Sequence, residues 1–91
     1  YNRYGGIMLN VVKNYISIMR KEDILKFAKK NNLQVSENEL DFLYTFIKNN
    51  YEYFLKNPNL LDISKYKDKF SSENYIFLNN LVNKYKRMII N

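Results

Sequence analysis

Apolar residues recur every three or four positions through most of this chain of 91 residues. That spacing puts them on one face of an α-helix, whereas the strict alternation of a half-buried β-strand is not sustained in any segment. Only two Gly and one Pro interrupt the chain, and it contains no internal repeat. The sequence therefore predicts an all-α fold: a single small domain of four to five short helices packed as a helix bundle.

The first apolar stripe starts at Met8 and predicts a helix over residues 8–18. Residues 1–7 include the adjacent Gly5 and Gly6, a pair that is typical of a flexible joint. We therefore predict irregular structure over residues 1–7, as a flexible N-terminal extension or expression remnant, and one helical domain over residues 8–91. The apolar face of the first helix is expected to contain Met8, Val11, Val12, Tyr15, Ile18 and Met19.

The charge pattern predicts a second helix over residues 21–31. Acidic residues occupy its first turn and lysines its last turn, where each charge interacts favourably with the helix dipole. Asn31 and Asn32 then supply a stop, because Asn tolerates the left-handed backbone conformation at a helix C-terminus. Residues 33–35 form a short extended link whose two apolar side chains are expected to point inward.

The clearest local signal in the chain is the start of a third helix at Ser36. The run Ser36-Glu37-Asn38-Glu39 is a capping box: the Ser36 hydroxyl accepts from the Glu39 amide, and the Glu39 carboxylate accepts from the Ser36 amide. The wide apolar face of this helix predicts a central position in the fold. Asn49-Asn50 is a point at which the helix could break, and Pro58 disfavours helix at the residue before it.

Two further helices are predicted after Pro58. Asn57 and Pro58 suit the cap and first position of a short fourth helix, and Phe70 is expected to anchor the turn that follows. Ser71-Ser72-Glu73 then opens a last helix, which keeps its apolar spacing to Ile89. We expect this last helix and the third helix to form the core pair.

The stretch Asp23-Ile-Leu-Lys-Phe-Ala-Lys-Lys-Asn-Asn-Leu-Gln-Val-Ser36 resembles the YqfT-like family, small helical proteins of unknown function from low-GC Gram-positive bacteria. The likeness covers about residues 10–86 and includes the capped C-terminal helix. It departs at Arg20, where the family tends to carry a Ser or Thr cap, and at the aromatic-rich residues 51–55. The resemblance implies a bacterial, cytoplasmic, all-α protein, and it carries over no functional residue.

The side chains that most enzymes use are missing, since the chain has no His and no Cys. This excludes thiolate nucleophiles, imidazole bases and metal sites that depend on either residue. Glu37, Glu39 and Asp41 crowd one helix start, where the helix dipole and the capping box already account for them. We predict a protein that is not an enzyme and needs no cofactor or metal. With no secretory signal and no membrane-spanning run, we expect a cytoplasmic location.

The chain is basic, with 15 Lys and Arg against 9 Asp and Glu and a net charge of +6. Lys26, Lys29 and Lys30 share one side of the predicted second helix and could lie along the phosphates of a nucleic acid. However, Asn, Lys, Ile and Tyr make up 45 of the 91 residues, and all four have AT-rich codons. The charge therefore fits a low-GC genome equally well, and nucleic-acid binding is the alternative function.

Aromatic residues crowd the third helix beyond what one core face requires. Those left uncovered would form an apolar patch that attracts a protein partner or a second copy of the chain. The predicted function is therefore a non-catalytic helical protein-interaction module, with self-association as one option. Its expected contact residues are Tyr44, Tyr51, Tyr53 and Phe54.

Overall fold

The computed structural model describes the backbone of residues 3–90 and the side chains of residues 10–87. This part of the chain contains helices and no strand, which confirms the all-α prediction. Two 3-10 helices, η1 and η2, lie between the third and fourth α-helices. The elements in chain order are α1 (Arg3–Ile18), α2 (Lys21–Lys30), α3 (Glu37–Lys56), η1 (Pro58–Leu60), η2 (Ile63–Lys69) and α4 (Ser72–Ile90).

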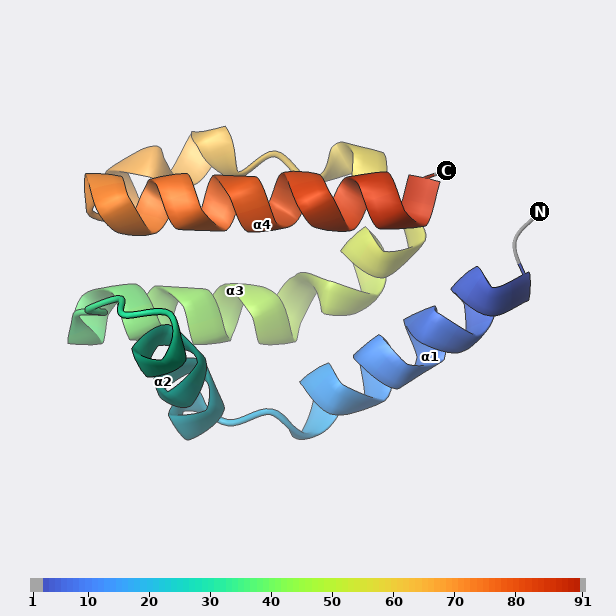
Figure 1. Ribbon diagram of the computed structural model, residues 1–91, viewed down its shortest axis with the longest axis horizontal. Coiled ribbons are helices and arrows are strands. Elements are labelled where there is room, and N and C mark those ends of the chain that lie inside the picture. Colours follow the sequence, from blue (N-terminus) through green and yellow to red (C-terminus); the bar gives the residue numbers. More distant parts are fainter. Residues whose placement is uncertain (1–2, 91) are drawn as a thin grey trace.

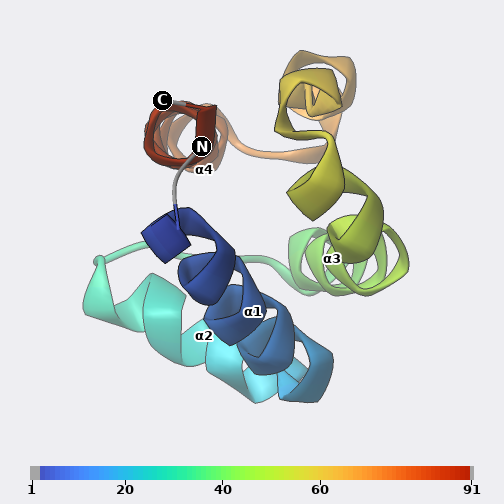
Figure 2. The same cartoon turned by 90° about the vertical axis from the view of Figure 1, so that its right-hand side faces the viewer.

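Helix α3 runs through the middle of the molecule (Figure 1). Helices α1 and α2 lie on one side of it, and α4 lies on the other side together with the two 3-10 helices. Figure 2, which looks along the long axis, shows the 3-10 segment beside α4 rather than between α4 and the α1–α2 pair. In the same view α4 lies over the α1–α2 pair, and α3 lies to one side of both, below the 3-10 segment (Figure 2).

The predicted capping box at the start of α3 is confirmed. The Glu39 amide donates to the Ser36 hydroxyl at 3.1 Å, and the Ser36 amide donates to the Glu39 carboxylate at 2.9 Å. Helix α3 continues through Asn49-Asn50 without a break. The Asn50 side chain donates to the Phe46 carbonyl one turn earlier, so it adds a bond within the helix. The helix ends at Lys56, ahead of Pro58 as predicted.

Helix α1 differs from its prediction at both its start and its inner face. It begins at Arg3, so residues 3–7 are helical rather than irregular, because each added helical residue gains a backbone hydrogen bond; residues 1 and 2 lie outside the described part. Of the apolar stripe expected to be buried, Val11, Tyr15 and Ile18 are exposed. Val12 and Met19 of the predicted stripe do face inward, together with Ile16, because two neighbouring apolar rows satisfy the same spacing.

The ends of α2 and the nature of the fourth helix follow from local chemistry. Asn32 adopts φ 58°, the left-handed conformation expected just beyond the end of α2. At the start of α2, the Arg20 side chain has no oxygen that could cap the helix. The Arg20 amide instead donates to the Asp23 carboxylate at 2.8 Å. The short fourth helix is present only as the 3-10 turns η1 and η2, the second opened by Asp62, which accepts from the Ser64 amide.

The expected core pair of α3 and α4 is not the closest pair. Helix α3 packs most closely on α1 and α2, while α4 packs on η1 and η2. The rings of Phe42, Phe46, Tyr66 and Phe70 pack between α3 and η2 in tilted and edge-to-face pairs. The radius of gyration is 13.3 Å, against about 12 Å for a compact chain of this length.

Candidate functional site

Two apolar cavities lie between α3, α4 and the α1–α2 pair, with volumes of about 200 and 320 Å³. Ile47 of α3 and Leu81 of α4 line both cavities, so the two are neighbours that meet at this pair of side chains. We call the two cavities together the apolar groove. Its floor is α3, and its walls are α4 on one side and α1 and α2 on the other.

The groove follows α3 for about three turns. Its floor extends from Leu43 in the first cavity to Leu55 in the second. At 1.5 Å per residue, this distance is about 18 Å along the helix. The groove therefore has the length of a short helix laid along α3.

The mouth of the groove carries large apolar residues that remain exposed to solvent. Tyr15 from α1 is 57% exposed, Phe27 from α2 is 46% exposed and Leu81 from α4 is 40% exposed. Phe27 also touches Phe77 of α4, with ring centroids 5.9 Å apart, and joins the two walls at that end. Burying one such side chain completely is worth about 1.5–3 kcal/mol, so the mouth holds a substantial driving force for association.

The core beneath the groove is correspondingly thin. Among the described residues, the buried apolar side chains are those of Met19, Ala28 and Leu40. Each of these three still has a small exposed fraction. Interiors of folded domains are normally close-packed, with few voids larger than a water molecule. The open space is therefore a feature that another molecule could fill.

The lining of the groove contains one buried side-chain polar atom that lacks a hydrogen-bond partner among the described residues. This atom is the Tyr85 hydroxyl, which is buried beside the second cavity. Burial raises the pKa of Tyr85 above its ordinary value, so the hydroxyl keeps its proton. It can donate one hydrogen bond to a group that enters the groove.

A polar cluster borders the first cavity where α3 and α4 begin. Glu39 and Asn74 are both buried, and the Asn74 side chain donates to the Glu39 carboxylate at 3.1 Å and to the Gln34 carbonyl at 2.8 Å. The Ser71 amide also donates to this carboxylate, at 2.8 Å. Burial raises the pKa of Glu39, but the hydrogen bonds from Ser36, Ser71 and Asn74 outweigh it and hold that pKa below its ordinary value.

The three lysines proposed for nucleic acid gather beside the groove. Lys26, Lys29 and Lys30 are exposed and line one shallow hollow on α2. Tyr15, Asp23 and Phe27 line both this hollow and the first cavity. The basic patch therefore continues directly into the apolar groove.

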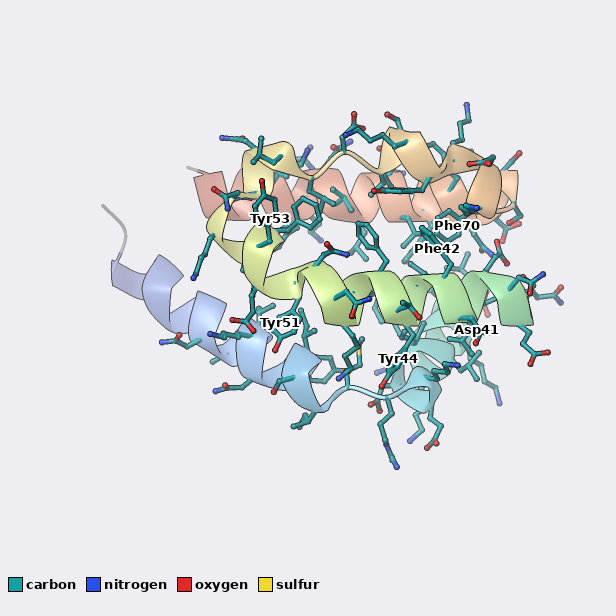
Figure 3. The ribbon with its side chains drawn as sticks, turned by 180° about the vertical axis from the view of Figure 1, so that it is seen from behind. Asp41, Phe42, Tyr44, Tyr51, Tyr53 and Phe70 are labelled. Atoms are coloured by element: carbon teal, nitrogen blue, oxygen red, sulfur yellow. The ribbon has the colours of Figure 1, made fainter. Side chains whose placement is uncertain are left out.

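The structure does not bring the four predicted contact residues together on one face. Tyr53 is exposed and points toward the η1 side of α3, where its ring meets that of Phe54 (Figure 3). Phe54 is half-buried against Phe46. Tyr51 and Phe54 both line the second cavity, and this is the part of the set that reaches the groove.

Tyr44 has an internal role in this structure. Its ring lies between the Lys21 and Lys48 ammonium groups, 5.7 and 5.6 Å from its centroid, on the side of α3 that faces α1 and α2. Lys48 also donates to the carbonyls of Ile16 and Ser17 at the end of α1. Tyr44 is therefore part of the joint that holds α1 and α2 on α3.

Sequence reasoning missed the residues that define the groove, chiefly Tyr15, Phe27, Ile47 and Leu81. Each sits in an apolar stripe that was correctly assigned to a helix. Periodicity shows which face of a helix is apolar, but not how far apart two apolar faces stand. The only sequence signal was the excess of apolar surface on α3.

No protein-family model, curated protein or solved structure matched this chain when it was compared with each. Within the described residues, no group of three or more acidic, His or Cys side chains is placed to hold a metal ion. None of the helices in that part of the chain has the length and hydropathy needed to cross a membrane.

Proposed function

We propose that this protein is a non-catalytic interaction module whose apolar groove binds a helix supplied by a protein partner. The observation that carries the proposal is the adjacency of two apolar cavities, which share Ile47 and Leu81, beneath a mouth of exposed apolar side chains. Exposed apolar surface of this kind is typical of binding sites. The resemblance to the YqfT-like family and the cytoplasmic location also remain predictions.

A helix is the occupant that suits the length of the groove, and its apolar side chains, rather than its backbone, would fill the cavities of about 200 and 320 Å³. The floor of about 18 Å accommodates roughly 12 helical residues. Such a helix presents apolar anchors at positions i, i+3, i+4 and i+7, the usual pattern of helix-in-groove recognition. The added helix would supply the apolar contacts that α4, standing away from α3, does not make.

Nucleic-acid binding is the second candidate, and the hollow lined by Lys26, Lys29 and Lys30 favours it. An interaction with phosphates would weaken steeply between about 50 and 200 mM salt. Insertion of an apolar helix would depend much less on salt, because apolar burial is not screened. Titration of a labelled duplex and a labelled single strand at both salt concentrations separates the two candidates.

The direct test of the proposal uses a synthetic helical peptide with Leu at positions i, i+3, i+4 and i+7 and uncharged Gln on its flanks. Amide chemical shifts of the protein are followed during the titration. Perturbations centred on Ile47, Leu81 and Tyr85 are expected. Absence of binding, or perturbations confined to the lysines of α2, would refute the proposed function.

A further inference from the structure

We infer that the partner helix carries acidic side chains along the edge that faces α2. This inference rests on the proposed function and adds the chemistry of the partner. It comes from the charges that border the mouth of the groove, which are mostly positive and are left without acidic partners.

The basic border begins on α2. Lys26 and Lys30 lie one turn apart, next to Phe27 at the mouth. Neither they nor Lys29 takes part in an ion pair among the described residues, whose pairs use Lys13, Arg20 and Lys21 instead. These ammonium groups are available to a ligand that covers Phe27.

Two acidic residues lie near this border, fewer than its lysines, so the border stays positive. Asp23 shares the hollow with three lysines and offsets only one of their charges, while its carboxylate also accepts a hydrogen bond from the Arg20 amide. Glu73 lies one turn before Phe77, in the first turn of α4, where the helix dipole favours an acid. Further along α4, exposed Lys84 follows Leu81 by one turn, so the second wall also presents a positive charge.

The same charges disfavour the other occupants. A second copy of the chain would bring a net charge of +6 to a border that is already basic. A single acyl chain could enter the cavities, but its one anionic head group would leave most of the bordering lysines without a partner. A helix with apolar anchors and acidic flanks satisfies both the apolar mouth and the lysines.

The test compares three labelled peptides that share the same Leu positions and carry Glu, Gln or Lys on their flanks. Fluorescence anisotropy gives the affinity of each for the full chain at low and high salt. Surface ion pairs are individually weak, so three or four together are expected to favour the Glu peptide over the Lys peptide by about tenfold. This preference should shrink at high salt, because the lysines are exposed.

Charge-reversal variants locate the preference. Lys26→Glu combined with Lys30→Glu should invert it, so that the Lys peptide binds more tightly. Lys56→Glu combined with Lys65→Glu changes the net charge equally at exposed positions away from the groove lining and should leave the preference in place. Far-ultraviolet circular dichroism of both variants confirms that each is folded.

The outcomes separate this inference from the function on which it rests. Equal binding of all three peptides, or an inversion produced equally by both double variants, overturns the acidic-partner inference and leaves the groove function standing. Failure of all three peptides to bind overturns the proposed function itself. A concentration-dependent dimer in sedimentation that Leu81→Asp abolishes, together with no binding of any peptide, assigns the groove to a second copy and overturns both.

Discussion

The carboxylate of Glu39 joins the first turns of two helices that are far apart in the sequence. It closes the capping box with Ser36 and also accepts from Ser71 and Asn74 at the start of α4. The sequence predicted the bond within the capping box, because it spans only three residues. It could not predict the bonds to Ser71 and Asn74, because they depend on the tertiary approach of α4.

Glu39→Gln is expected to lower the free energy of unfolding by about 1–3 kcal/mol, because an amide group would face donors that now meet a carboxylate oxygen. Urea denaturation followed by circular dichroism measures the change. Glu37→Gln is the matched control in the same helical turn: it is exposed and should change stability by less than about 0.5 kcal/mol. Equal effects of the two substitutions would contradict the role of Glu39.

The pH dependence of stability provides a second prediction for the same residue. The pKa of Glu39 is lower in the folded protein than its ordinary value, so the folded state binds fewer protons in this range. The ionised Glu39 carboxylate therefore adds to the free energy of unfolding. This contribution is present in full above the unfolded-state pKa of about 4.3 and is lost as the pH falls through the folded-state pKa. The stability difference between wild type and Glu39→Gln should therefore shrink between about pH 6 and pH 3, and a constant difference would contradict the assignment.

At the scale of elements, caps and breakers set the helix boundaries that the sequence predicted. Ser36 opens α3, Asn32 follows the end of α2, and Ser71 accepts from the Asn74 amide at the start of α4. The buried face of α1 was predicted only in part, since Val12 and Met19 face inward but Val11, Tyr15 and Ile18 are exposed. The inner row is selected by docking onto α3, through the Lys13–Glu52 ion pair and the bonds from Lys48, and these contacts are not local.

Lys48→Met is expected to loosen α1. The substitution keeps an apolar stem but removes a cation that donates to the last carbonyls of α1, at a cost of about 1 kcal/mol. Hydrogen exchange should quicken for the amides of residues 10–18 more than for those at the centre of α3. Lys56→Met, at an exposed position near the end of α3, is the control. Uniform acceleration in both variants would argue against a specific joint.

At the scale of the whole molecule, the helices leave space rather than closing on one core. The aromatic residues on α3 have three different surroundings. Phe42 and Phe46 belong to the ring cluster with η2, and Tyr44 belongs to the joint with α1 and α2. Phe46, Tyr51 and Phe54 line the second cavity of the groove. The width of the groove depends on how far α4 stands from α3, and apolar spacing contains no information on that distance.

Val82→Phe, in the lining of the second cavity, should stabilise the free protein by about 0.5–2 kcal/mol, because the ring fills open apolar space. The same substitution should weaken binding of the Gln-flanked peptide. Thermal unfolding and anisotropy measure the two effects. If the site were close-packed, the added ring would lower the free energy of unfolding by about 1–3 kcal/mol. That result would contradict the presence of the groove. Val11→Phe, at an exposed site on α1, is the control.

The central claim is that the groove between α3, α4 and the α1–α2 pair binds a helix. Its most direct test is calorimetric titration of the Gln-flanked peptide into Leu81→Asp and Ile76→Asp. Both positions are exposed on α4, but only Leu81 lines the groove. Leu81→Asp should weaken binding at least about tenfold, because it buries an unpaired charge, while Ile76→Asp should bind like wild type. Equal affinities in the two variants would contradict the account.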